Sequence, residues 1–438
     1  MQNKLRNSSL FTKHRKRKLR VAFLIAERFP EPVGSFLLDQ ITSFIDQGID
    51  ISVFALAKKE NAEHENIKKY NVLERTTFLN VPKNEFVRLL DSIPILIKGL
   101  FNNPIKVLKS FNIKRYGKMA LTLNFLYWYS ALPKLKEDFD IIHCHFGPVG
   151  LMGLYLKDIG IKGKLVVSFY GSDIGNYPKK VGKEEVYIPL FKAGDVFIAN
   201  SGIIKKRLIK HGCHEDKIAQ IIPVAIRDNK FKPSKTMKKP KEYIRILTIA
   251  RLMEEKGHKY AIQAIAELVQ KNCRNIKYII VGDGPEKRYL ENLVLELGIK
   301  KYVEFLGRVD DKEIIEQYKM AHIFILPSIH ATKYFSEEGQ GMVNQEAQLM
   351  ELPIISTNVG GIPEGMLDGK SGFIVPEKDS SSIANKIEIL INNPLLRKKM
   401  GKEGRKFVKV RYSPEKMAHD TIKVYEDILK DEQNGIMR

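Results

Sequence analysis

The sequence has few cysteines and no long apolar run, and each of these absences excludes a class of protein. Its 438 residues include only three cysteines, Cys144, Cys213 and Cys273, without a C-x-x-C pair. Neither a disulfide framework nor a cysteine zinc site is therefore expected, and this usage fits a reducing cytoplasm. No run approaches the roughly 20 uncharged apolar residues of a membrane-spanning helix. We expect a chain that does not cross a bilayer by itself.

The N-terminus lacks the pattern of a secretory signal. Its first twenty residues are basic, but the apolar run VAFLIAERF that follows is short, ends in charge and has no small-residue cleavage site. This run is interpreted as a first strand. The overall content, 44% apolar and 28% charged residues, is ordinary for a globular protein, and the length favours two domains.

Positive charge is present in excess, and it is concentrated in one half of the chain. Residues 1–240 hold 42 Lys and Arg against 22 Asp and Glu, whereas residues 241–438 hold 31 against 29. This asymmetry indicates an anionic partner for the first half, either nucleic acid or an acidic membrane surface. A Lys-rich solvated surface without a partner is the simpler alternative.

Strand-like apolar runs alternate with helical periods, which predicts an α/β fold of two doubly wound parallel-sheet domains. We place the first domain at 1–235, the second at 236–412 and a terminal helix at 413–438 that packs back on the first domain. The Lys-rich stretch 229–243, with two prolines, is the predicted linker. The predicted strands are LRVAFLIA, IDISVFAL, DIIHCHF, KLVVSFYG, DVFIANS and KIAQIIPV, then IRILTIA, IKYIIVG, VEFLG, HIFILPS and LPIIST.

Residues 84–136 interrupt this alternation with mixed apolar and basic residues. Helices with an apolar face and a basic rim can lie on a membrane surface. They can equally cover the first sheet, and the two interpretations can hold for different helices. The terminal stretch is more regular, because Met417, Thr421, Val424 and Ile428 form one stripe of a helix.

Candidate ligand-binding residues follow the strands of the second half, because ligands of parallel α/β domains bind beyond the carboxyl ends of the strands. Arg251 and Lys256 follow IRILTIA and together could neutralise a diphosphate. Gly282 and Gly284 form a tight turn after IKYIIVG, but the full G-x-G-x-x-G pattern is missing. A structural turn is at least as good an interpretation of these glycines as ligand contact.

The most informative stretch is EEGQGMVNQEAQLM, in which Glu338 and Glu346 lie eight positions apart. Gly339 and Gly341 free the start of a helix, where backbone N–H groups can approach an anion. Glu346 would then lie in the helix at reach of sugar hydroxyls, with Glu338 on the loop. Two solvated glutamates are the alternative.

The first half offers weaker candidates. His143 and His145 lie on one side of a strand, and His145 is predicted to face a cleft, whereas a metal site lacks further ligands. Tyr170 and Asp173 could reach an acceptor hydroxyl. Gly34 and Ser35 precede a helix and form another possible anion seat.

Six motifs follow one another in the second half of the chain: ARLMEEKG, VGDGP, VEFLGRV, the Glu338-x(7)-Glu346 pair, LPIISTNVGGIPE and DGKSGFIVP. In these motifs and their order, the second half resembles the family-4 glycosyltransferases, also called glycosyl transferases group 1. These are retaining enzymes of the GT-B fold, with two Rossmann-like domains facing a cleft. The match covers about 170 residues. The first half resembles enzymes of bacterial exopolysaccharide assembly, of the colanic-acid kind, in the stretches FPEPVGSFLLDQI, IIHCHFG and FYGSD.

The resemblance implies a UDP- or GDP-linked sugar donor on the second domain and a glycan acceptor, lipid-linked, on the first. On that pattern Arg251 and Lys256 bind the diphosphate and Glu346 binds the ribose. Glu338 and the backbone of Gly339, Gln340, Gly341, Met342 and Val343 hold the transferred sugar and phosphate. No metal or other cofactor is implied, because cations and backbone donors stabilise the leaving diphosphate. The expected location is the cytoplasm, peripheral on the inner face of the cell membrane.

Two departures from the family pattern leave questions open. Tyr170 stands where many relatives have histidine, and His145 is the candidate to replace it. Ala225 and Arg227 alter a segment that often reads P-x-G-[IV]-D. The alternatives kept are a nucleotide-sugar epimerase of the same fold and a noncatalytic nucleic-acid-binding protein. The second lacks any recognised nucleic-acid module.

Overall fold

The computed structural model describes residues 18–30, 36–59, 65–135, 138–233, 240, 242–331 and 338–433. The chain divides into two compact units: residues up to 166 with those from Tyr425 on, and residues 167–424. The strands of the first sheet end at Ala199 and those of the second begin at Ile244. The predicted boundary at residue 235 stays a prediction.

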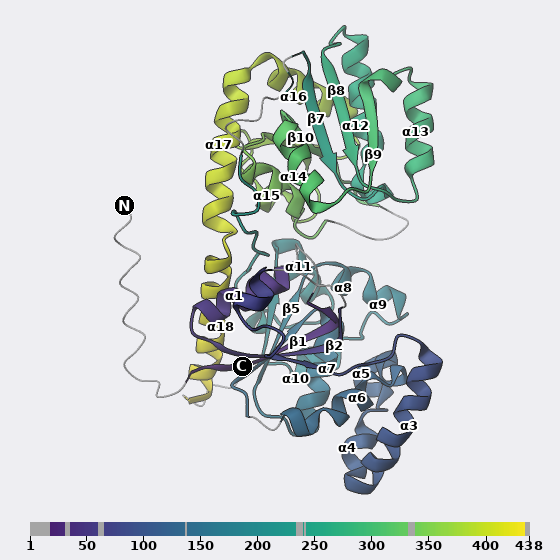
Figure 1. The fold of residues 1–438 in the computed structure, drawn as a ribbon, viewed down its shortest axis with the longest axis vertical. Coiled ribbons are helices and arrows are strands. Elements are labelled where there is room, and N and C mark those ends of the chain that lie inside the picture. The colour runs from purple at the N-terminus through teal and green to yellow at the C-terminus, as the bar shows by residue number, and fades with distance from the viewer. Residues whose placement is uncertain are drawn as a thin grey trace, which may run out of the picture. The chain divides into compact units, whose positions relative to one another are not determined.

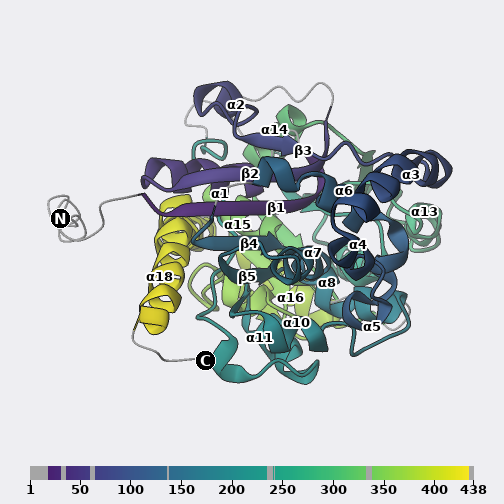
Figure 2. The same cartoon turned by 90° about the horizontal axis from the view of Figure 1, so that it is seen from below.

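Two six-stranded parallel sheets with helices confirm the predicted α/β architecture. The first has the order β3-β2-β1-β4-β5-β6, and Figure 2 shows β2, β1 and β4 side by side. Its strands carry continuous apolar runs, as expected where helices cover both faces of a parallel sheet. The strands are β1 (Arg20–Phe29), β2 (Asp50–Lys58), β3 (Thr76–Phe78), β4 (Ile141–His145), β5 (Lys164–Phe169) and β6 (Val196–Ala199).

The second sheet has the order β12-β11-β10-β7-β8-β9, with every neighbouring pair parallel. Figure 1 shows β7, β8, β9 and β10 together with α12 and α13 beside them. The strands are β7 (Ile244–Ile249), β8 (Ile276–Val281), β9 (Val303–Gly307), β10 (Ile323–Leu326), β11 (Ile354–Thr357) and β12 (Gly372–Val375). The carboxyl end of β7 lies in the centre of the strand order, next to those of β8 and β10, where the candidate residues were predicted.

The helices of the first unit include the predicted insertion. They are α1 (Phe36–Asp46), α2 (Glu65–Lys69), α3 (Glu85–Asn102), α4 (Pro104–Lys109), α5 (Ile113–Tyr116), η2 (Gly117–Thr122), α6 (Asn124–Ser130), η3 (Leu132–Leu135) and α7 (Gly147–Asp158). Phe125, Leu126 and Trp128 of α6 are buried, so this helix covers the core as one of the two interpretations expected. In Figure 1, α3 and α4 lie together at the periphery of the first unit.

The second unit and the terminal helix complete the fold. Its helices are α8 (Ser172–Gly175), α9 (Tyr177–Lys180), α10 (Ile188–Ala193), α11 (Gly202–Lys210), η4 (Glu215–Lys217), η5 (Glu254–Lys256), α12 (His258–Gln270), α13 (Lys287–Glu296), η6 (Lys300–Tyr302), α14 (Asp311–Met320), α15 (Met342–Leu349), η7 (Ile362–Gly365), α16 (Ser380–Asn392), α17 (Pro394–Arg411) and α18 (Pro414–Gln433). No helix in the described ranges is long and apolar enough to cross a membrane.

The terminal helix α18 confirms the predicted stripe. Met417, Thr421, Val424 and Ile428 are all buried. Further along, the hydroxyl of Tyr425 lies 2.5 Å from Nδ1 of His143. The part of α18 from Tyr425 on therefore packs within the first unit.

One predicted strand is wrong and two strands were not predicted. KIAQIIPV forms only an isolated bridge between Phe197 and Ile218, with Ile222 N donating to Ala199 O. Pro223 has no N–H group with which to extend the pairing. The missed strands β3 and β12 contain only three and four residues.

Candidate functional site

The second unit contains a cavity of about 460 Å³ where several predicted residues meet. Its predicted lining residues are Tyr170, Arg251, Lys256, Glu338 and Gly339, and the others are Gly171, Ser172, Asn176, Arg207, Met253 and Glu255. They come from segments up to 169 positions apart in the sequence. Gly282, Gly284 and Glu346 do not belong to this lining.

Arg251 and Lys256 reach the cavity from the segment that follows β7. The side chain of Lys256 is only 17% exposed and pairs with the carboxylate of Glu338, which is equally buried. Arg251 is 72% exposed, and its Nη2 lies 3.9 Å from Oε1 of Glu255. Arg251 is therefore solvated and Lys256 is neutralised by Glu338, and both are available to an anionic ligand.

Gly257 explains how Lys256 is held in place. Its φ of +64° belongs to the left-handed region, and a Cβ there would lie 1.9 Å from the carbonyl oxygen of Pro327. Only glycine permits this close approach. The turn that carries Lys256 is thus packed directly against Pro327, the first residue after β10.

Gly282 and Gly284 have a packing function in this structure. A Cβ at Gly282 would lie 2.0 Å from the carbonyl oxygen of Ala250, and one at Gly284 would lie 2.3 Å from that of Leu252. Leu252 N donates to Asp283 O. These glycines therefore let the turn after β8 support the backbone on both sides of Arg251, as the structural interpretation expected. Their contact with a donor stays a prediction.

A second pair of glycines, in the NVGGIPE segment, supports Glu338. Gly361 N donates to Glu338 O at 2.9 Å, and a Cβ at Gly360 would lie 2.0 Å from the same oxygen. Gly339 is equally confined, because its Cβ would lie 2.5 Å from Tyr170 O. The loop that carries Glu338 is thus packed on backbone, which holds its carboxylate at the cavity.

Gly341 begins helix α15 with a φ of +71°. In the part of the chain that the structure describes, the backbone N–H groups of Met342 and Val343 have no acceptor. Free N–H groups at a helix start attract an anion. Gln340 has another task, because its buried side chain bonds both backbone groups of Val224, at 2.8 and 2.9 Å.

Glu346 lies one turn into α15. Its Oε2 accepts a hydrogen bond of 2.9 Å from the hydroxyl of Tyr318. Burial raises its pKa from 4.5 to about 7, although Tyr318 and the charge of Lys230 oppose this shift. A carboxyl group with such a pKa can both donate and accept hydrogen bonds near neutral pH. This suits contact with neutral hydroxyl groups.

The raised pKa of Glu346 predicts a pH-dependent stability difference for Glu346→Gln. In the folded state the carboxyl binds a proton up to about pH 7, but in the unfolded state only up to 4.5. This group therefore lowers the free energy of unfolding as pH rises from 4.5 to 7. The glutamine keeps an acceptor for Tyr318 without the charge. We expect its Tm to rise relative to wild type over this window, by about 2 °C or more. Thermal unfolding at pH 4.5 to 8 measures this, and a constant difference would contradict it.

His145 does not face open space, which corrects the prediction of a cleft-facing imidazole. It is fully buried in the first unit, with its ring centroid 4.0 Å from that of Phe23 and 4.2 Å from that of His143. Burial and the neighbouring His143 lower its pKa well below 6.5. The strand β4 is covered on both faces, and alternation along it cannot reveal this. A part of His145 in the reaction stays a prediction.

Asp173 is also placed differently from its prediction. It is buried, and its Oδ1 accepts hydrogen bonds from Tyr170 N at 3.1 Å and Gly171 N at 2.8 Å. The carboxylate therefore shapes the loop, and its contact with an acceptor stays a prediction. Tyr170 does line the cavity, and burial raises the pKa of its hydroxyl, which stays protonated. Gly34 and Ser35 lie outside the described residues.

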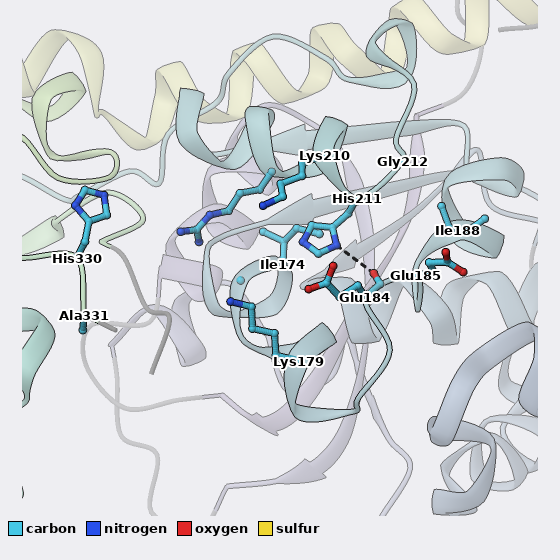
Figure 3. A pocket seen from close by; sticks show the side chains of 12 residues that line it. Ile174, Lys179, Glu184, Glu185, Ile188, Lys210, His211, Gly212, His330 and Ala331 are labelled. Carbon is cyan, nitrogen blue, oxygen red and sulfur yellow. Dashed lines mark hydrogen bonds between the residues drawn. The ribbon is translucent and has the colours of Figure 1, made fainter. Parts of the chain in front are cut away.

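A second cavity of about 510 Å³ adjoins the first through the shared residue Arg207. Figure 3 shows Lys179, Lys210 and His211 among its walls, with His330 on a separate segment. The Nδ1 atom of His211 lies 3.1 Å from Glu184 O, drawn as a dashed line. These walls carry more positive than negative groups, so the second cavity suits a polar or anionic molecule.

The residues of this region that the sequence analysis missed include Arg207, Glu255 and Tyr318. Glu255 is adjacent to Lys256 in the motif, but its burial and its position beside Arg251 depend on the fold of the turn. Arg207 lies on α11, whose first N–H group, Gly202 N, donates to the Glu364 carboxylate at 2.7 Å. Glu364 belongs to the motif LPIISTNVGGIPE.

Most of the chain is similar to known glycosyltransferases. Residues 33–224 match the family model Glycosyltransferase Family 4, and residues 229–407 match Glycosyl transferases group 1. The putative colanic acid biosynthesis glycosyltransferase WcaL of Escherichia coli (strain K12) is 31% identical, over 84% of this chain and 90% of its own. The amylovoran biosynthesis glycosyltransferase AmsK of Erwinia amylovora is 30% identical, over 82% and 87%.

The fold agrees with solved structures. Anabaena Alr3699/HepE, solved in complex with UDP and glucose, superposes with a TM-score of 0.66 at 17% identity, over 93% of this chain and all of its own. At that identity the likeness concerns the fold, and it confirms the GT-B architecture predicted from the motifs.

Proposed function

This chain belongs to the glycosyl transferases of group 1, of the exopolysaccharide type, and we propose that it moves a hexose from a nucleoside-diphosphate sugar to a lipid-linked glycan with retention of configuration. The observation that carries the proposal is the cavity in which Arg251, Lys256 and Glu338 meet. Two cations and one carboxylate match a donor that combines a diphosphate with a polyhydroxylated sugar.

The proposed donor lies with its diphosphate between Arg251, Lys256 and the start of α15. Charge accumulates on the leaving diphosphate as the sugar bond breaks, and fixed cations and N–H groups stabilise it. Lys256 is paired with Glu338 in the structure, so the donor takes over the lysine and frees the carboxylate for hydroxyl groups of the sugar. Glu346, further into the helix, accepts the ribose hydroxyls.

The reaction we propose needs no protein nucleophile and no divalent metal. Because the diphosphate leaves from the face at which the acceptor enters, its own oxygen takes the acceptor proton. The electrostatic work of a metal falls to Arg251 and Lys256, and chelation by EDTA should leave the rate unchanged. We place the acceptor in the second cavity, next to Arg207, and the enzyme at the cytoplasmic face of the membrane, where lipid-linked glycans are held.

A panel of nucleotide sugars tests the donor. UDP-glucose is the first choice, since the Anabaena protein of the same fold was solved with UDP and glucose. At a hundred times its Kd a donor adds about 2.7 kcal/mol of stability, visible as a rise in Tm. The stabilising sugar is then offered with acceptor glycolipid, and proton NMR of the product reports the anomeric configuration. An inverted product, or epimerisation of the donor without transfer, would overturn the proposal.

A further inference from the structure

The helices α3 to α5 and the residues just after them expose most of the large apolar side chains found on the described surface. Of the twenty large apolar residues that are exposed, thirteen lie between residues 86 and 121. Single exposed apolar residues are normal, but a contiguous group marks an interaction site. We call this group the α3–α5 surface; its most exposed members are Phe86, Phe101, Ile105, Leu108 and Leu121.

Helix α3 has its amphipathic faces reversed relative to a normal surface helix. Its inward face carries Arg88, Ser92 and Gly99, spaced four and seven positions apart. Arg88 donates to the carbonyl oxygens of Pro82 and Thr122, and Ser92 and Gly99 are the buried positions of the helix. The apolar stripe therefore points away from the protein, at the cost of leaving it in water.

This reversal is fixed by packing. A Cβ at Gly99 would lie 2.6 Å from Val107 of α4 and 2.8 Å from Tyr129 of α6. A larger residue would not fit between these helices. Because Gly99 of α3 makes this contact, the leucines, isoleucines and phenylalanines of the helix lie on the side that faces solvent.

The charge around the α3–α5 surface has one predominant sign. Between residues 84 and 121 the sequence has seven lysines and arginines but only two acidic residues, Glu85 and Asp91. Lys109 and Arg115 bind Asp158 of α7. Lys98, Lys114 and Lys118 are exposed. An apolar stripe beside exposed lysines is complementary to a layer of anionic headgroups over acyl chains.

We propose that the α3–α5 surface docks on a membrane of anionic lipid, with its apolar stripe among the upper acyl chains and its lysines at the headgroups. A second copy of the chain fits less well, because it would bring the same cations together. The purpose of docking rests on the proposed function, because docking would bring the enzyme to a lipid-linked acceptor. Docking itself needs neither donor nor turnover.

Vesicle sedimentation with a matched pair of double variants tests the surface. Phe101→Ser with Ile105→Ser removes side chains that are 87% and 68% exposed on the α3–α5 surface. Leu395→Ser with Val410→Ser removes side chains that are 84% and 67% exposed elsewhere. We expect wild type and the second pair to bind phosphatidylglycerol vesicles equally, and the first pair to bind at least about tenfold more weakly.

Three results would overturn the docking proposal. The first is that the first double variant binds phosphatidylglycerol vesicles as strongly as wild type. The second is that wild type binds phosphatidylglycerol and phosphatidylcholine vesicles equally. The third is that wild type binds no vesicles but forms a dimer, and that the first double variant is a monomer. The rise in Tm with nucleotide sugars is measured on the same variants. If the proposed function is wrong, none of these proteins will show the rise in Tm. If only the docking proposal is wrong, all of them will still show it.

Discussion

Replacement of Lys256 by alanine is expected to lower kcat by about a thousandfold, because it removes a cation from the place where charge develops on the leaving diphosphate. The lysine is held by a turn that Gly257 packs against Pro327. Initial rates with saturating donor and acceptor measure the effect.

Lys259→Ala is the matched control for this loss. Lys259 lies three positions further on, in α12, and its ammonium lies over the ring of Tyr260 at 5.9 Å. It does not belong to the cavity lining, and its replacement should leave kcat within about twofold of wild type. Cooperative thermal unfolding of both variants excludes a general loss of fold. Equal rates for Lys256→Ala and Lys259→Ala would remove Lys256 from the reaction.

Replacement of Glu346 by alanine is expected to reduce kcat/KM for the donor by about a hundredfold, because it removes the carboxyl group that bonds the ribose hydroxyls. The effect should appear mainly in KM, since the ribose is remote from the reacting bond. Steady-state kinetics over a range of donor concentrations separates the two constants.

Two further variants sharpen the prediction for Glu346. Tyr318→Phe removes only the hydroxyl that bonds Glu346 Oε2, so it should retain most of the activity and raise KM slightly. Glu296→Ala, at the exposed end of α13, should behave as wild type. If Tyr318→Phe lost as much as Glu346→Ala, the carboxylate would serve the packing of α14 and α15 and not the donor.

The sequence predicted the fold well because its signals were local and repeated. Buried parallel strands are continuous apolar runs, and the residues that follow them lie at one edge of the sheet. Arg251, Lys256 and Glu338 were therefore predicted near one another, and they line one cavity. The predicted contribution of Glu346 rests on a motif, and the structure adds its partner Tyr318 and the raised pKa.

Other features depended on contacts that no local pattern encodes. His145 was predicted to face a cleft, but its strand is parallel and is covered on both faces. Asp173 turns back on the amides of its own loop, and Gln340 is occupied by Val224, over a hundred positions away. The reversed faces of α3 follow from the tight packing of Gly99. Periodicity finds such a stripe but not the side on which the protein lies.

The affinity for nucleoside diphosphates and monophosphates tests the central claim most directly. Isothermal titration calorimetry of UDP, UMP, GDP and GMP is carried out on wild type, Lys256→Ala and Lys259→Ala. If Arg251 and Lys256 hold the diphosphate, wild type and Lys259→Ala will bind one of the diphosphates at least about tenfold more tightly than its monophosphate. Lys256→Ala will lose most of that preference. An undiminished preference in Lys256→Ala would contradict the account of the site.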